Sequence, residues 1–321
     1  MVPAVVTPPW TVPLTTSEHT LTYYFLLFAG LALFVGFVRA WVTRSEVGPR
    51  YRTAVVARLG IMSVASLSYL ILIFEFAAGY TLRSGMYRPN AAAILAFEPR
   101  YVEWSVAVPL LVIELFAVCS IAGSAARRSR VIATSAAFLM IFTGFLGAFV
   151  IDDGASVFSL VLFGVISAVF WVLSNIVMIR VVQHSMTKLT PGAASILRAA
   201  TILLLSGWII YPIVYVVQIV SAGGAWATAI QVTLCIADIS VKLGFSGLIH
   251  RVAKLRTAED VRAGEDIHPE AIWISSVKQS DAGMPREVYL EPSATIHSPR
   301  LAPATQSAVP SEPLPEDLDE V

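Results

Sequence analysis

Charged residues are scarce in this sequence, and so are cysteines. Asp, Glu, Lys and Arg make up 14% of the 321 residues, and hydrophobic residues make up 56%, whereas soluble domains carry about 25% charged residues. This composition excludes an ordinary soluble protein and indicates a membrane protein. Cys119 and Cys235 lie in apolar segments without metal-ligand spacing, so they are interpreted as small core residues rather than a disulfide, and no metal site is expected. No DNA-binding, nucleotide-binding or kinase motif occurs, so no nucleic-acid partner is expected.

Long apolar segments dominate the chain. Each is long enough to cross the ~30 Å hydrocarbon core of a bilayer as a helix, and short connections join them. The seven segments are residues 20–42, 53–79, 99–123, 130–152, 155–182, 193–220 and 226–251. The sequence therefore predicts an all-α, multi-pass protein of the cell membrane, a seven-transmembrane-helix bundle whose surroundings are the lipid bilayer.

Basic residues are distributed unevenly around these segments. Residues 1–256 contain 18 Lys and Arg against 9 Asp and Glu, whereas residues 257–321 contain 4 against 13. The basic residues cluster after the first, third, fifth and seventh segments, and an excess of Lys and Arg marks cytoplasmic loops. We therefore expect residues 1–19 to be an extracellular N-terminal segment, residues 20–256 to be the membrane bundle, and residues 257–321 to be a cytoplasmic C-terminal tail.

The tail is acidic and rich in proline, a composition that disfavours a packed core. Two short apolar runs within it, residues 271–274 and 288–290, resemble strands. They are expected either to form a short strand pair or to dock on the cytoplasmic face. As an output segment the tail would bind a soluble cytoplasmic transducer or another protomer; a tail without any role in signalling is an equally open interpretation.

An aspartate and a lysine lie four residues apart in the seventh segment, which is otherwise almost entirely apolar. On a helix this spacing puts Asp238 and Lys242 on one face. Because a charged lysine at membrane depth is costly, such a residue indicates a functional site with a partner nearby. The alternative is a buried ion pair that only fixes helix packing.

The third segment carries most of the other intramembrane charge. Arg100 and Glu103 lie within one turn of each other, and Glu114 follows eleven residues after Glu103 on nearly the same face. Two carboxylates on one stripe, near opposite sides of the bilayer, suit proton acceptance and donation. In the second segment, Arg58 either extends its head group back to the cytoplasmic surface or is buried against an acid. In the alternative interpretation, Glu103 and Glu114 only form ion pairs with Arg100 and Arg58.

Several aromatic residues accompany the buried lysine. Trp104, Trp171, Trp208 and Tyr211 come from the third, fifth and sixth segments, and aromatic stripes of this kind are usually plain packing. Around one lysine they also suit a flat, apolar ligand.

Three short motifs, each weak by itself, form a specific combination. The third segment contains Arg100-Tyr101-Val102-Glu103-Trp104 and then Pro109-Leu110-Leu111, the sixth contains Trp208 and then Tyr211-Pro212, and the seventh contains Asp238 with Lys242. Together they resemble the microbial rhodopsin family over segments two to seven. The resemblance implies a seven-helix protein that carries retinal on the lysine.

By position, the resemblance implies that Lys242 binds all-trans retinal covalently as a protonated Schiff base, with Glu103 and Asp238 as counterions. Arg100 would lie on their extracellular side. A protonated Schiff base in apolar surroundings needs carboxylate neighbours to keep its proton. Since homo-oligomers are common in the family, a second copy of the chain is also an implied partner.

The implied retinal pocket draws on most of the segments. Its residues are Tyr69, Trp104, Leu111, Met140, Thr143, Gly144, Trp171, Ser174, Met178, Trp208, Tyr211, Pro212 and Tyr215. Tyr69 and Tyr211 are further implied to donate hydrogen bonds to Asp238.

The sequence departs from the pumps of this family at several positions. Glu103 stands where the pumps usually have aspartate, and Ala107, one turn on, replaces the usual hydroxyl residue, so Glu103 lacks that hydrogen-bond partner. Glu114 occupies the cytoplasmic donor position of many eubacterial pumps. Arg58 stands where the archaeal pumps carry a threonine, and a buried arginine there is most like the cryorhodopsin group.

The expected activity follows from these positions. Light isomerises the retinal on Lys242, the Schiff base passes its proton to Glu103, and a UV-absorbing state results. Recovery needs a proton from the cytoplasmic side through Glu114. An arginine beside Glu114 stabilises the ionised carboxylate, and an ionised carboxylate is a poor donor. We therefore expect a long-lived UV-absorbing state and a slow photocycle, suited to light sensing and photoswitching rather than to enzyme catalysis.

Two alternatives stay open. If Arg58 extends to the surface, Glu114 stays neutral, and the expected function is a light-driven outward proton pump with Glu103 as acceptor and Glu114 as donor. The other is a seven-helix receptor or structural membrane protein without a chromophore, which stays colourless after retinal is added.

Overall fold

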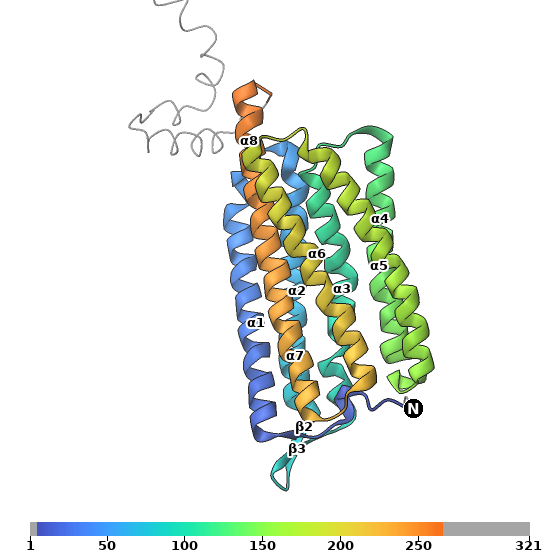
Figure 1. Cartoon of the computed structure of the whole chain (residues 1–321). Coiled ribbons are helices and arrows are strands. Elements are labelled where there is room, and N and C mark those ends of the chain that lie inside the picture. The colour runs from blue at the N-terminus through green and yellow to red at the C-terminus, as the bar shows by residue number, and fades with distance from the viewer. Residues whose placement is uncertain (1–4, 266–321) are drawn as a thin grey trace, which may run out of the picture. The chain divides into compact units, whose positions relative to one another are not determined.

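Long helices follow one another through residues 5–265, which the computed structural model describes (Figure 1). They are α1 (Thr16–Val42), α2 (Arg52–Gly79), α3 (Glu98–Ala117), α4 (Gly123–Phe145), α5 (Val157–Met186), α6 (Pro191–Val220), α7 (Gly224–Ile239) and α8 (Ser246–Ala263). A π-helical turn, Ser240–Phe245, joins α7 to α8 without a loop, so the two make one membrane crossing. Each helix packs against the next in the chain and α7 packs against α1, which closes the bundle.

Short helical turns fill most of the connections. They are Pro9–Thr11, Thr43–Glu46, Pro49–Tyr51, Ala91–Ala96 and Asp152–Gly154, with a π-helical turn at Leu146–Val150. The described residues up to Arg256 form one compact unit, and the short described stretch that begins at Thr257 belongs to a second. The two strand-like runs predicted at 271–274 and 288–290 lie outside the described residues.

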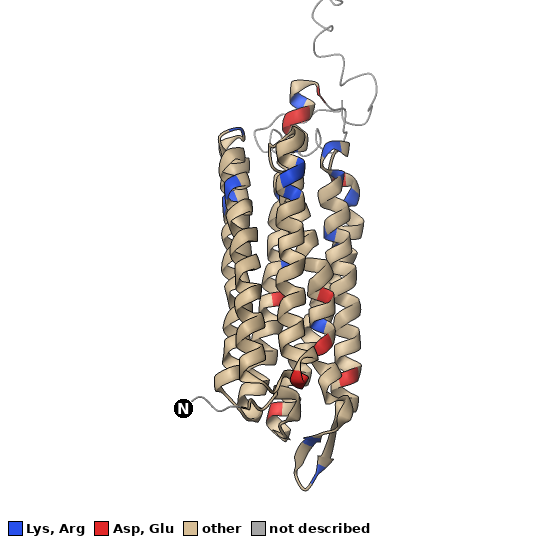
Figure 2. Ribbon diagram, turned by 90° about the vertical axis from the view of Figure 1, so that its right-hand side faces the viewer, with Lys and Arg blue, Asp and Glu red and all other residues tan. Residues whose placement is uncertain are grey.

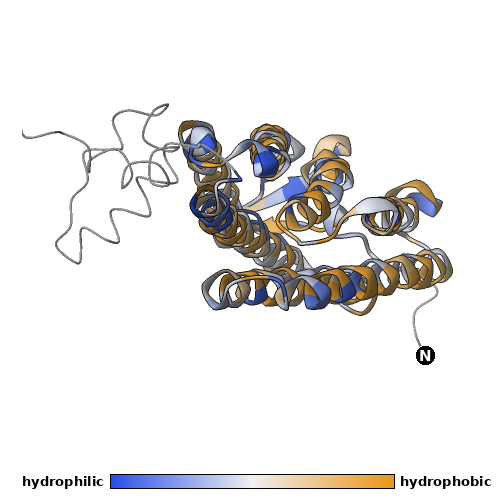
Figure 3. Ribbon diagram, turned by 90° about the horizontal axis from the view of Figure 1, so that it is seen from above, coloured by the Kyte–Doolittle hydropathy of each residue, from blue (hydrophilic) through white to orange (hydrophobic). Residues whose placement is uncertain are grey.

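The helices have the composition of membrane spans. Among the described residues, six helical stretches contain 18-residue windows with mean hydropathy between 1.7 and 2.4. The helix α3 is not among them, because each such window of it contains Arg100, Glu103 and Glu114 and so carries more than two charged residues. Large apolar side chains are exposed along α1, α2, α5 and α6, and hydrophobic residues cover the helices when the bundle is viewed along its axis (Figure 3). These exposed surfaces suit contact with lipid.

Polar residues begin several of the helices. Thr15 accepts a hydrogen bond from the backbone of Glu18, whose side chain accepts one from Thr15 in return, and this capping box starts α1. Thr190 caps α6, and Pro191 occupies its first position, where the missing N–H costs nothing.

A small antiparallel sheet lies at one end of the helical bundle. Its strands are β1 (Leu14–Thr15), β2 (Tyr80–Arg83) and β3 (Met86–Pro89), in the order β1-β3-β2. Ser84 and Gly85 have φ of 51° and 81°, which is the left-handed geometry of a tight hairpin turn. The connection after α2 is therefore a hairpin, and β1 joins the N-terminal segment to it.

Several predicted helix boundaries are also wrong. The third helix ends at Ala117 rather than at 123, and the fourth helical stretch, Gly123–Val150, begins at Gly123 rather than at 130. The basic residues at 127–130 lie in the first turns of α4 and not in a loop. They are tolerated there because long basic side chains can extend from a helix end to water. The seventh helix continues past the predicted residue 251 to Ala263.

The two ends of the bundle differ in charge. Figure 2 shows Lys and Arg gathered at one end of the bundle, where α1 ends and α4 begins, which we call the basic end. The opposite end holds the three strands and is called the sheet end.

Candidate functional site

Lys242 lies buried between two carboxylates in the middle of the bundle. Its Nζ is 2.7 Å from Glu103 Oε2 and 3.1 Å from Asp238 Oδ1, and all three side chains are buried. The prediction that Asp238 and Lys242 share one helix face is confirmed. Lys242 belongs to the π-helical turn Ser240–Phe245, and such turns are frequent at functional sites. The arrangement can hold a proton on the nitrogen and can pass it to Glu103.

Asp238 is held by three hydrogen bonds besides its ion pair. Tyr211 donates to Oδ1 at 2.8 Å, Trp104 donates to the same oxygen at 3.2 Å, and Tyr69 donates to Oδ2 at 2.9 Å. The predicted hydrogen bonds from Tyr69 and Tyr211 are therefore both present. These three donors hold the Asp238 carboxylate in place beside Lys242.

Glu103 has fewer partners than Asp238. Its Oε1 is buried without a hydrogen-bond partner among the described residues. The neighbouring Ala107 is buried and has no hydroxyl to offer, as the sequence predicted. Glu103 therefore has an oxygen, free of donors among the described residues, on which a proton can be held.

Arg100 lies on the sheet-end side of this group, and its partners were not predicted. It donates to Gln231 Oε1, and its Nη2 donates to Cys235 Sγ at 3.4 Å. The guanidinium also lies 5.4 Å from the centre of the Tyr69 ring, a cation–π contact. No salt bridge joins Arg100 to a carboxylate in the described part of the chain. Gln231 and Cys235 were missed because neither residue type indicates an arginine partner by itself.

The predicted pocket residues divide by burial. Those buried inside the bundle are Tyr69, Trp104, Leu111, Met140, Gly144, Ser174, Met178 and Trp208, and those partly buried are Thr143, Trp171, Tyr211 and Tyr215. Pro212 lies on α6 and is exposed.

These residues fit retinal chemically. A buried primary amine flanked by carboxylates can form and protonate a Schiff base, and aromatic and sulfur-containing side chains suit a flat polyene. The indole nitrogens of Trp171 and Trp208 are buried without protein partners among the described residues. The hydroxyls of Ser174 and Thr143 are instead used on backbone carbonyls, of Ala133 and Leu139 respectively, which leaves an apolar lining.

Glu114 lies on the basic-end side of Lys242, and its hydrogen-bond partner is a serine rather than Arg58. Its Oε2 accepts a hydrogen bond from Ser246 at 2.7 Å, while Oε1 has no partner among the described residues. Arg58 is buried, only 6% exposed, and donates to Thr43 at 3.3 Å. It neither extends to the surface nor forms a salt bridge with Glu114, although the two charges interact electrostatically. A buried carboxyl with one hydroxyl partner is most stable in its neutral form.

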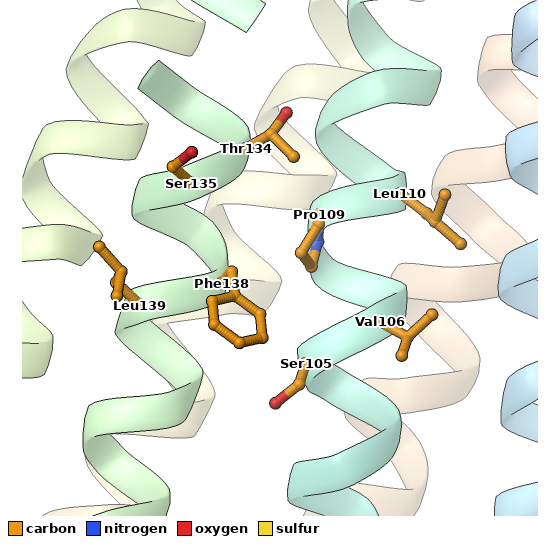
Figure 4. Close-up of a pocket in the computed structure, with 8 residues that line it drawn as sticks. All are labelled: Ser105, Val106, Pro109, Leu110, Thr134, Ser135, Phe138 and Leu139. Atoms are coloured by element: carbon orange, nitrogen blue, oxygen red, sulfur yellow. The ribbon is translucent and has the colours of Figure 1, made fainter. Parts of the chain in front are cut away.

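A pocket of about 620 Å³ lies between α3 and α4, on the outer side of the bundle (Figure 4). It is lined by Ser105, Val106, Pro109, Leu110, Thr134, Ser135, Phe138 and Leu139. None of these belongs to the group predicted to bind retinal, so this pocket is separate from the Lys242 site.

The fold and the site define a helical membrane protein with a buried lysine held between carboxylates. The family described as Bacteriorhodopsin-like protein matches residues 19–255. The chain belongs to this family, the microbial rhodopsins. Its members bind retinal through a Schiff base and are light-driven pumps and photoreceptors rather than enzymes.

Solved structures agree with this assignment. Xanthorhodopsin, described as a light-driven ion pump with dual chromophore, is 26% identical, with a TM-score of 0.69 over 77% of this chain and 98% of that chain. Thermophilic rhodopsin is 25% identical, with a TM-score of 0.69 over 78% and 98%. Exiguobacterium sibiricum rhodopsin is 20% identical, with a TM-score of 0.61 over 74% and 97%, and shares the fold. The comparison with curated proteins gives no match.

Proposed function

We propose that this protein is a retinal-binding photoreceptor whose proton returns slowly after illumination. Bound as a protonated Schiff base in the all-trans form, retinal supplies light absorption, isomerisation and a near-UV shift when the Lys242 nitrogen loses its proton. The rest of the cycle depends on the protein's own side chains. The observation that carries the proposal is Arg58, a buried charge in the basic-end half of the bundle.

The first proton transfer covers a short distance. The Lys242 Nζ lies 2.7 Å from Glu103 Oε2, whereas three hydrogen-bond donors already stabilise the Asp238 carboxylate. Glu103 also has a free oxygen. We therefore assign Glu103 as the proton acceptor, with Asp238 as the second counterion.

The return of a proton is the slow part. Glu114 can supply it, but it would then be left as a buried carboxylate with Ser246 as its hydrogen-bond donor. That transfer is therefore unfavourable in free energy until a new proton arrives at Glu114 from the basic end. The permanent charge of Arg58 repels this proton: unit charges 5–10 Å apart repel by about 1.7–3.3 kcal/mol at an effective dielectric of about 20. The repulsion corresponds to a slowing of about 10- to 300-fold.

The proposal includes an orientation. The basic end faces the cytoplasm, because positive residues gather on that side of membrane proteins, and the N-terminus and the sheet end are outside. The buried arginine makes the protein most similar to the cryorhodopsin group. Its acidic tail would then be available on the cytoplasmic side for a transducer or a second copy of the chain.

Time-resolved absorption of the retinal-loaded protein tests the proposal, with wild type beside Arg58→Gln. Glutamine keeps a donor for Thr43 and removes the charge. We expect a near-UV state lasting seconds or longer in the wild type, shortened about 10- to 300-fold in the variant. Arg39→Gln is the matched control, since Arg39 is an exposed arginine at the same end, and it should leave the lifetime nearly unchanged. Recovery in milliseconds that is indifferent to Arg58→Gln would refute the proposal.

An outward proton pump is the second candidate, and the placement of Glu103 and Glu114 on opposite sides of Lys242 favours it. A pump would acidify the outside of cells or vesicles in the light, and an uncoupler would abolish the effect. In that case recovery would be fast, and Glu114→Gln would slow it.

A further inference from the structure

A second cluster of titratable side chains lies at the basic end, away from Lys242. Glu46, in the helical turn after α1, has its Oε2 3.1 Å from His250 Nε2, and Lys254 Nζ donates to the same oxygen. His250 is 9% exposed, whereas the side chains of Glu46 and Lys254 are 28% and 25% exposed. The cluster therefore connects water with the buried part of the bundle.

The helix α8 links this cluster to Glu114. Ser246, His250 and Lys254 follow one another at intervals of four residues and so lie along one face of the helix. Ser246 is fully buried and donates to Glu114. The axial step from His250 to Ser246 is about 6 Å, a gap that a single water molecule can bridge.

We propose that His250 and Glu46 form the site that takes up protons at the basic end and returns them to Glu114. A neutral imidazole accepts a proton from water, and the Glu46 carboxylate stabilises the resulting cation. The imidazolium then releases a proton towards the Ser246 hydroxyl, which passes one on to the ionised Glu114. One proton moves inward, and both the imidazole and the Glu114 carboxyl end neutral.

This proposal rests on the proposed function in one respect, that Glu114 gives up a proton during the photocycle. The charges around His250 set when the site operates. Burial disfavours the charged imidazole, and Arg58 on α2 and Lys254 on the same helix repel a proton, whereas Glu46 attracts one. The imidazole is therefore charged mainly when protons are abundant, and proton uptake depends on pH.

A structural clamp between α1 and α8 is the alternative role for this cluster. A clamp needs only a hydrogen-bond donor opposite Glu46, whereas a proton relay needs a group that titrates. Glutamine at position 250 provides the donor without the titration. His250→Gln therefore separates the two roles.

The experiment is flash photolysis of the full-length, retinal-loaded protein with a pH-indicator dye in the same sample. In the wild type, uptake and recovery should quicken as the pH falls, because the His250 imidazole takes up a proton more readily when protons are abundant. In His250→Gln, uptake at neutral pH should be about tenfold slower or more, with a flat pH dependence. An unchanged dark absorption maximum shows that the variant is folded, because about 12 Å of helix separates His250 from Lys242.

His184→Gln is the matched control, because His184 is an exposed histidine on α5 that contacts Lys188 rather than an acid. It should behave as the wild type, and added imidazole should restore uptake in His250→Gln. Glu46→Gln, a second variant, should also slow uptake because the imidazolium loses its carboxylate.

Unchanged uptake in His250→Gln, or slowing that imidazole does not restore, would overturn the relay and leave the clamp. The failure of the relay and the failure of the proposed function can be distinguished. A wild type that recovers in milliseconds refutes the slow photoreceptor, whereas the ratio of uptake rates between wild type and His250→Gln still decides the relay.

Discussion

Replacing Ser246 with alanine should prolong the near-UV state. Ser246 donates to Glu114 Oε2 at 2.7 Å, and Oε1 has no partner among the described residues. When Glu114 gives up its proton, the new carboxylate therefore depends on this donor. A hydrogen bond to a charged group contributes about 1.5–3 kcal/mol. Its loss should slow proton transfer from Glu114 about 10- to 150-fold.

Time-resolved absorption in the near UV measures this effect, and infrared difference spectra of the carboxyl C=O stretch assign it to Glu114. Ser240→Ala is the matched control, because Ser240 is exposed and its hydroxyl donates to the Ile236 carbonyl at 2.8 Å. The control should decay at the wild-type rate. A decay in Ser246→Ala that equals the control, or is faster, would show that Glu114 is already ionised in the dark, and the reasoning would fail.

Two further predictions concern the Lys242 site. Tyr69→Phe should lower the free energy of unfolding by about 1.5–3 kcal/mol, since the lost hydroxyl donates to Asp238. Tyr80→Phe should leave that free energy unchanged or raise it, because the Tyr80 hydroxyl is buried without a hydrogen-bond partner among the described residues; a detergent titration followed by absorbance compares the two, and equal losses would contradict the assignment. Lys242→Ala should stay colourless after retinal is added, whereas Lys254→Ala should become coloured; colour in both would place the chromophore elsewhere.

Much of the fold could be predicted, because apolar length and buried charge are properties of single segments. The four-residue spacing of Asp238 and Lys242 was enough to predict that they share one face of the seventh helix. The hairpin at 80–89 was missed because the apolar segments on either side of it predict helices and give no information about strand pairing between them. The early start of α4 at Gly123 was missed because basic residues in a first helical turn look like those in a loop.

The site was predictable where a residue type implies its chemistry, and less so where packing decides. Arg58 and Glu114 were both recognised as unusual, but their separate partners, Thr43 and Ser246, depend on how α1 and α8 lie against α2 and α3. A serine in an apolar helix gives no signal, because its hydroxyl can always bond to a carbonyl one turn back. His250 was missed for a related reason, since a single histidine near a helix end indicates nothing until Glu46 lies opposite.

The three-stranded sheet also constrains the order of assembly. The strand β1 is synthesised before α1, yet its partner β3 follows α2 and is reached only after both helices have been made. Pairing of Leu14 with Tyr87 thus closes a long loop, and closing such a loop is slow until the intervening chain is organised. The sheet can form only when α1 and α2 have been inserted as an antiparallel pair, which brings the two strands to the same side of the membrane. The β1–β3 pairing therefore holds together the two ends of the hairpin that α1 and α2 form.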